Sequence, residues 1–349
     1  MDEIHIYQYA SNPVCAPYRF DFPGKLLNQR PGFRVSQFTE FDSKAFAAIL
    51  NDGDMFFIQR LPMSPTLAKV LSELNRRGIP VIFDIDDNLL QLTPDSRFSQ
   101  LANANYERRI RQSLEAAQAV QCSTPRLAEA LKNIHPEVAV LENQLDAVPS
   151  LTKRKIGDPI IIGYAAGEDH YLDWLTIKER YHETVSDLDA LGYPVETYII
   201  GDRAIFESLT TPRKKYLPFL PRQAYLEFLQ QIDISLIPLA DNAFNRCKSD
   251  VKFLESAACG AAVVASQVVF QNCVEHAKTG FLFDTLDEFA TVLKRLIRNP
   301  ALIQNLARNA YDFVSQNRLM QHHLAKWETT YRQWYERRGE LLVEKLCQG

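Results

Sequence analysis

Two lysines and a glutamate within one short stretch can together bind a diphosphate beside a hydroxyl-bearing group. Lys248, Lys252 and Glu255 are spaced by four and then three residues, which places them on one face of a helix. Lysine side chains and the free amides at a helix N-terminus both attract phosphate oxygens, and a carboxylate accepts hydrogen bonds from hydroxyl groups. The spacing therefore indicates a phosphate-binding helix, although an ordinary amphipathic surface helix has the same pattern.

The residues around these three predict a loop, a helix and a buried strand. Ser249 or Asp250 can cap the helix, because short polar side chains accept hydrogen bonds from amides that have no intrahelical partner. Gly260 ends the helix, and residues 261–265 are small and apolar, as in a strand covered on both faces. The apolar residues expected to pack are Val251, Leu254 and Ala258.

Composition sets limits on the whole chain. Its 349 residues suffice for two domains, and 46% hydrophobic with 23% charged residues is typical of a soluble globular protein. A formal net charge of −4 gives no overall attraction to nucleic acid, so we expect no nucleic-acid partner. The six cysteines form no Cys-x-x-Cys pair, so neither a zinc site nor a disulfide framework is expected.

The N-terminal residues and the hydropathy pattern predict where the protein resides. No apolar run approaches the roughly 18 to 20 residues of a membrane span. The first residues lack the basic start and apolar core of a signal peptide. We therefore expect a cytoplasmic protein. Basic residues at 108, 109, 111 and 153–155 allow peripheral contact with the inner face of the cell membrane, although a solvated charge run has the same composition.

Strands and helices alternate along the chain, which predicts parallel sheets with crossover helices in two α/β halves. Residues 147–159, with two prolines, a glycine and three consecutive basic residues, predict a linker between the halves. The predicted strands are 4–9, 33–38, 55–59, 80–89, 119–122 and 138–141, then 159–163, 195–201, 234–238, 261–265 and 281–283. The predicted helices are 65–77, 106–117 and 125–133, then 172–191, 225–231, 251–259, 286–298, 301–315 and 319–346.

At this point the chain resembles the retaining glycosyltransferases of the GT-B fold, in particular family 4. The second half carries, in the family's order, Asp233-Ile-Ser-Leu-Ile-Pro-Leu239, the stretch from Lys248 to Ser266, and Thr279-Gly-Phe-Leu-Phe283. Weaker similarity is found at Val140-Leu-Glu-Asn-Gln-Leu-Asp146 and Ile162-Gly-Tyr-Ala-Ala-Gly-Glu-Asp-His170. The resemblance covers roughly residues 120–315 and is poor in the first 100.

The resemblance implies two Rossmann-like domains that face a central cleft. Residues 1–150 form the acceptor-side domain, residues 156–318 form the domain that binds the nucleotide-sugar donor, and a C-terminal helix within 319–349 packs back on the first domain. It also implies sugar transfer to an acceptor hydroxyl with retention of configuration, no cofactor and no obligatory metal. Family habit suggests a role in cell-surface glycan or glycoconjugate synthesis, with a glycan, lipid-linked or protein acceptor.

The resemblance also assigns residues. Glu255 matches the second of two family glutamates and is expected to accept from the donor ribose, whereas Cys247 stands where the first is expected. Lys248 and Lys252 then act through the diphosphate, and His170 lies near the diphosphate or simply bonds Asp173. The other expected donor-site residues are Gly163, Gly167, Gly201, Asp202, Arg203, Leu220, Ser249, Asp250 and Val251. The expected acceptor-side residues are Tyr18, Arg19, Asp86 and Asp87.

Two alternatives of other classes remain open. Phe83-Asp-Ile-Asp-Asp-Asn-Leu89 resembles the first motif of the haloacid-dehalogenase phosphatases, in which Asp84 would be the nucleophile and Asp86 the acid–base in a Mg²⁺ site. Ser123 or Thr124, and Gly201-Asp202 with Glu207, would supply the later motifs. In the second alternative, Cys247 marks a GT-B protein that binds a sugar nucleotide without turnover.

Overall fold

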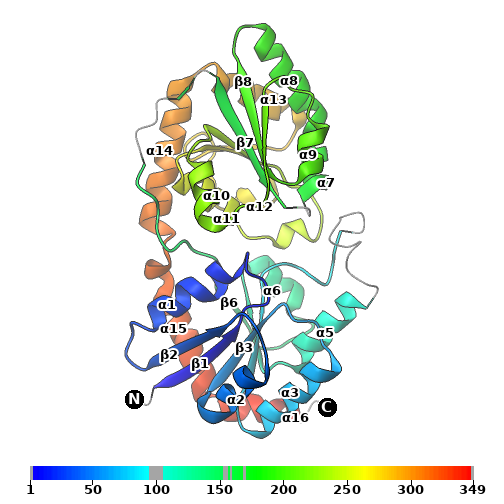
Figure 1. Cartoon of the computed structure of the whole chain (residues 1–349), viewed down its shortest axis with the longest axis vertical. Coiled ribbons are helices and arrows are strands. Elements are labelled where there is room, and N and C mark those ends of the chain that lie inside the picture. Colours follow the sequence, from blue (N-terminus) through cyan, green and yellow to red (C-terminus); the bar gives the residue numbers. More distant parts are fainter. Residues whose placement is uncertain (1–2, 94–104, 152–155, 158, 168–169, 347–349) are drawn as a thin grey trace.

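The computed structural model describes residues 3–93, 105–151, 156–157, 159–167 and 170–346, and consists of two α/β domains stacked end to end (Figure 1). Each domain contains a six-stranded sheet in which all strands are parallel. The predicted fold class, two Rossmann-like domains, is confirmed. The basic residues 153–155 lie outside the described residues.

The sheet of the first domain has the order β2-β1-β3-β4-β5-β6. The order reverses between β1 and β3, and the loops that follow these two strands therefore diverge at that point. The strands are β1 (Ile4–Tyr9), β2 (Phe33–Phe38), β3 (Met55–Gln59), β4 (Val81–Ile85), β5 (Ala119–Cys122) and β6 (Val138–Val140). The helices are η1, a π-helical turn (Pro17–Asp21), α1 (Phe22–Leu27), α2 (Ser43–Asp52), α3 (Pro65–Arg76), α5 (Tyr106–Ala116) and α6 (Pro125–Leu131).

The second sheet has the order β12-β11-β10-β7-β8-β9, and its order reverses between β7 and β10. Its strands are β7 (Ile160–Ala166), β8 (Val195–Gly201), β9 (Lys214–Leu217), β10 (Ile234–Ile237), β11 (Ala262–Ser266) and β12 (Phe281–Phe283). Its shorter helices are α7 (Tyr171–Leu175), α9 (Arg203–Ser208), α10 (Arg222–Leu229), η3 (Asn245–Cys247), α11 (Val251–Ala258) and α12 (Gln267–Phe270). Its longer helices are α8 (Lys178–Ala190), α13 (Leu286–Ile297) and α14 (Pro300–Asn317).

The central strands β3, β4, β10 and β11 are buried along their whole length because helices cover both faces of each sheet. Successive residues of β3 show this: Phe56 and Ile58 join one core, whereas Met55 and Phe57 join the core on the opposite face. Local sequence sets the helix starts. Ser64 caps α3 by accepting from the Leu67 amide at 3.1 Å, with Pro65 at the first helical position.

Several short elements were not predicted, and two predicted helices are interrupted. The helices η1, α1 and α2 and the strand β9 lie in segments that the sequence left without structure. The helix predicted over 172–191 divides into α7 and α8, and the helix predicted over 319–346 divides into α15 (Met320–Glu336) and α16 (Arg338–Leu346). The interruptions lie at residues 176–177 and at Arg337.

The chain crosses between the domains twice at one place. Leu145, on the way to the second domain, forms a parallel bridge with Leu319, on the way back. Helix α14 packs on the second domain, and α15 returns to the first (Figure 1). The side chains of α15 that enter the first-domain core are Met320, Leu324, Trp327, Tyr331 and Trp334.

None of the helices among the described residues combines the length and the apolar character needed to cross a membrane.

We predict that Trp327→Ala destabilises the first domain by about 3–5 kcal/mol, the usual loss for a buried tryptophan. Its side chain is buried against the sheet, and the Arg19 guanidinium lies 5.4 Å from its ring centroid. Urea unfolding followed by circular dichroism measures the change. Tyr335→Ala, at the half-buried edge of the same cluster, is the control. Equal unfolding midpoints for the two variants would show that the packing of α15 contributes little to the stability of the first domain.

Candidate functional site

A cavity of about 790 Å³ lies between the two domains, at the carboxyl ends of both sheets. The first domain contributes the segments that follow β1, β3 and β4. The second contributes the end of β7, the segment before α10, and α11 with the loop that precedes it. Ligands of open α/β sheets bind where the strand order reverses, and both reversals of this fold border the cavity.

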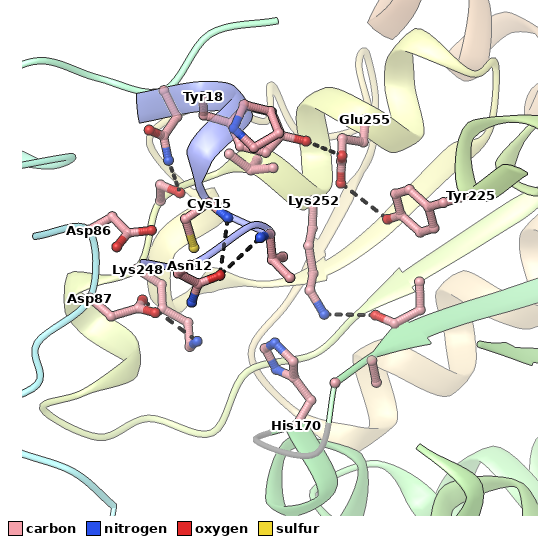
Figure 2. Close-up of a pocket in the computed structure, with 18 of the residues that line it drawn as sticks. Asn12, Cys15, Tyr18, Asp86, Asp87, His170, Tyr225, Lys248, Lys252 and Glu255 are labelled. Carbon is pink, nitrogen blue, oxygen red and sulfur yellow. Dashed lines mark hydrogen bonds and ion pairs between the residues drawn. The ribbon is translucent and has the colours of Figure 1, made fainter. Parts of the chain in front are cut away.

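The two lysines of the predicted phosphate-binding helix both line this cavity. Lys252 donates to the Ala165 carbonyl at the end of β7, at 2.7 Å, and lies 5.8 Å from the Tyr164 ring centroid. Lys248 lies 3.8 Å from a carboxylate oxygen of Asp87 and 4.6 Å from the Phe244 ring centroid. Figure 2 shows both side chains pointing into the same space as His170. The structure thus brings the two cations together at the start of α11.

Glu255 also lines the cavity, and it accepts hydrogen bonds from both domains. The Tyr18 hydroxyl donates to its Oε1, the Arg222 guanidinium donates to the same oxygen at 3.2 Å, and Tyr225 donates to Oε2 at 3.1 Å. Burial raises the pKa of Glu255 above its ordinary value, and the bond from Tyr18 and the charge of Arg222 offset that rise only in part. The three hydrogen bonds hold the Glu255 carboxylate in a fixed orientation.

His170 bonds Asp173, one of the two alternatives that the sequence offered, and it also lines the cavity. Its Nδ1 lies 2.7 Å from Asp173, and its side chain lines the cavity. The other Asp173 oxygen accepts from the Ala240 amide at 2.8 Å and from the Asn245 side chain at 2.7 Å. Asp173 therefore orients His170 and fixes the start of the loop that carries Lys248.

In the first domain, Arg60 and two aspartates form a charged cluster at the cavity. Arg60 follows β3 in a left-handed conformation with φ 47°, which turns its side chain toward Asp86 and Asp87. Burial alone would raise the pKa of Asp86, but the charge and the hydrogen bond of Arg60 outweigh it, so the pKa is lowered. Both aspartates line the cavity, are paired with Arg60, and have carboxylate oxygens that can accept hydrogen bonds.

Arg19 was expected on the acceptor side, and the structure places it elsewhere. Its guanidinium is fully buried inside the first domain, with Nη2 2.8 Å from the Asp84 carboxylate, and it also donates to Asn143 at 3.0 Å. These contacts and the bond to the Leu141 carbonyl satisfy the Arg19 guanidinium inside the domain, where an acceptor substrate cannot reach it. Asp84 is buried in its ion pair with Arg19, so it cannot be the nucleophile of a phosphatase.

The predicted cap of α11 is also not formed. Asp250 stands at the cap position, but its carboxylate pairs with Arg318, whose Nη2 lies 3.1 Å away. The Ser249 hydroxyl accepts from the Asn143 amide at 3.0 Å and lines the cavity, as does Val251. Ser249 thus contacts the first domain and Asp250 pairs with Arg318 after α14, so neither side chain satisfies the helix amides.

Besides Asp250, four predicted donor-site residues do not line the cavity. A Cβ at Gly163 would lie 2.0 Å from Ile232, and one at Gly201 would lie 2.2 Å from the Ala166 carbonyl, so both glycines permit close packing. Asp202 caps α9 through the Ala204 amide at 2.8 Å, and Arg203 pairs with Glu207 at 2.9 Å on the surface. The remaining predicted residues, Gly167, Leu220, His170 and Tyr18, do line it.

Cys247 occupies the position of the missing glutamate but faces the first domain. It is buried in the core of that domain, and its Sγ accepts from the Asn88 amide at 3.6 Å. Its carbonyl accepts from the Thr124 hydroxyl at 2.9 Å. A thiol fits this apolar contact, where a carboxylate would lose its solvation. The loop before α11 is therefore part of the domain interface.

Sequence reasoning missed Arg222, Tyr225 and Arg60. Arg222 and Tyr225 are three residues apart at the start of α10, which puts them on one face, toward Glu255. Pro221 before them was the signal that could have located this helix start. No local pattern identifies Arg60. Among the described residues, no group of three or more His, Cys, Asp or Glu side chains is placed to hold a metal ion.

We predict that Asp84→Asn lowers the free energy of unfolding by about 3–5 kcal/mol, because it leaves the Arg19 charge buried without a counter-ion. Urea unfolding measures the loss. Asp42→Asn is the matched control, since Asp42 caps α2 and asparagine caps equally well. If the two variants were equally stable, the buried pair would not hold this part of the site.

Comparisons with known proteins show similarity in part of the sequence and in the fold. Residues 179–329 match a family model described as glycosyl transferase-like. No curated protein sequence matches the chain. The matched segment contains α11, both lysines and Glu255.

Solved structures resemble nearly the whole chain. Sucrose-phosphate synthase from Thermosynechococcus elongatus superposes with a TM-score of 0.66 at 12% identity, over 96% of this chain and 100% of that chain. Anabaena Alr3699/HepE in complex with UDP-glucose gives 0.61 at 15% identity, over 94% and 100%.

The pneumococcal O-GlcNAc transferase GtfA, in complex with UDP and GlcNAc, gives a TM-score of 0.56 at 13% identity, over 82% of this chain and 57% of that chain. At these identities the likeness shows the fold, which all three share with this chain. The chain therefore has the fold of the GT-B glycosyltransferases and carries a glycosyl transferase-like domain at residues 179–329.

Proposed function

We propose that this protein is a glycosyltransferase that moves a sugar from a nucleotide-sugar donor to an acceptor hydroxyl. The observation that carries the proposal is the convergence of Lys248, Lys252 and Glu255 in the cavity between two GT-B domains. A nucleotide-sugar has a diphosphate next to a ribose, which is the order in which these side chains follow from the loop before α11 into that helix. The bound UDP and UDP-glucose of the HepE structures give independent support for such a donor.

The chemistry requires stabilisation of a leaving group. When the bond between the sugar carbon and the diphosphate oxygen breaks, that oxygen keeps the electron pair and gains negative charge. The acceptor oxygen forms the new bond to the sugar carbon and gives its proton to an oxygen of the departing diphosphate. The ammonium groups of Lys248 and Lys252 and the free amides of α11 are fixed before the reaction. They stabilise the developing charge more than the ground state. We further propose retention of configuration and no metal or other cofactor, which rest on the family resemblance.

The acceptor is proposed to bind on the first-domain side of the cavity. The Asp86 and Asp87 carboxylates there, both paired with Arg60, are suited to sugar hydroxyls, and Tyr18 on η1 lines the same cavity. A glycan, lipid-linked or protein acceptor presents such hydroxyls. We propose a cytoplasmic enzyme of cell-surface glycan synthesis, with peripheral membrane contact where the acceptor is lipid-linked.

A thermal-shift panel of UDP, GDP, dTDP, ADP and CMP tests the donor site. Ligand present at 100 times its dissociation constant stabilises a protein by about 2.7 kcal/mol, so a true ligand raises the melting temperature clearly. We expect one nucleoside diphosphate to stand out. No stabilisation by any of the five would contradict the proposal. Stabilisation without transfer from any matching sugar donor would instead favour a nucleotide-binding protein that has lost turnover.

We predict that Lys252→Ala lowers kcat about 100- to 1,000-fold, as expected when a fixed charge next to the leaving group is removed. Release of nucleoside diphosphate from the matching donor measures the rate, and circular dichroism checks folding. Lys278→Ala is the control, because Lys278 pairs with Glu275 at 2.8 Å on the surface. A Lys252→Ala variant with the rate of the control would show that Lys252 does not face the diphosphate.

A further inference from the structure

Glu255 is the point at which the two domains meet inside the cavity. Tyr18 reaches it from η1 in the first domain, whereas Arg222 and Tyr225 reach it from α10 in the same domain as Glu255. The Tyr18 hydroxyl also accepts from the Arg222 guanidinium at 2.7 Å. The ring of Tyr18 packs edge-on against Phe22, with centroids 5.6 Å apart. The hydroxyl is therefore held in place on the carboxylate.

These bonds fill most of the capacity of the carboxylate. An ionised carboxylate offers about four acceptor positions on its two oxygens. Tyr18 and Arg222 use Oε1, and Tyr225 uses one position of Oε2. A ribose that presents two neighbouring hydroxyls, one to each oxygen, has to displace one of the two side chains that bond Oε1. Arg222 stays near whatever the first domain does, because α10 packs beside α11. Tyr18 is therefore the side chain that can give up its hydrogen bond to Oε1.

We propose that the Tyr18 hydroxyl occupies, in the ligand-free protein, the position on Glu255 that a ribose hydroxyl of the donor takes. This inference rests on the proposed function and on the ribose as the group that meets Glu255. Donor binding then breaks one hydrogen bond between the domains, and Tyr18 weakens donor affinity. The contact makes a residue of the acceptor-side domain a determinant of donor binding.

The test compares Tyr18→Phe with the unaltered chain by calorimetry. Phenylalanine keeps the ring packing, and Arg222 and Tyr225 still satisfy Glu255, so the variant is expected to fold. The probes are inorganic pyrophosphate, which has no ribose, and whichever of UDP, GDP, dTDP and ADP stabilises the chain most. We expect Tyr18→Phe to bind the nucleoside diphosphate about 3- to 10-fold more tightly, the equivalent of one net hydrogen bond. Pyrophosphate affinity should not rise.

Tyr7→Phe is the matched control, since the Tyr7 hydroxyl donates to the Asp52 carboxylate at 2.8 Å outside the cavity. It should leave both affinities unchanged. Equal or weaker nucleoside diphosphate binding by Tyr18→Phe overturns the inference and leaves the proposed function standing. An equal gain for pyrophosphate also overturns it, because the effect would then not involve the ribose. If the unaltered chain binds none of the nucleotides, the proposed function fails, and the inference fails with it.

Discussion

The contact between the two domains around Glu255 is the interaction on which the site depends. Each domain has its own core, and the cavity exists only where the carboxyl ends of the two sheets face each other. Polar contacts fix that arrangement: Tyr18 with Glu255, Asn143 with Ser249, and Thr124 with the Cys247 carbonyl. All three use α11 or the loop that precedes it. The segment proposed to hold the donor is therefore also the segment that docks the first domain.

This double use explains the unusual residue at position 247. A loop that binds a sugar can present a carboxylate to it, whereas a loop that enters an apolar core cannot keep a carboxylate solvated. Cys247 lies in the core of the first domain, so the loop serves there as an interface. We propose that the donor contacts then fall to Lys248, Lys252 and Glu255. Arg222, next to Glu255, is an additional cation that lines the cavity.

Much of the fold could be predicted, because two patterns are strong in the sequence. Buried parallel strands such as β3 and β4 are continuous apolar runs, and helices such as α3 have caps and periodic leucines. Elements such as α1 and β9 are too short for a periodic signal. The site residues, too, could be predicted only where the signal is local. Local helical spacing brought Lys252 and Glu255 together, but the burial of Arg19 depends on Asp84, which is distant in sequence and which spacing cannot reveal.

The most direct test of this account is a crystal structure grown with whichever of UDP, GDP, dTDP and ADP stabilises the chain most. The account predicts the diphosphate beside Lys248 and Lys252, ribose hydroxyls on Glu255, and the Tyr18 hydroxyl displaced from that carboxylate. A nucleotide bound outside the cavity would contradict it. So would a nucleotide in the cavity whose phosphates lie away from both lysines.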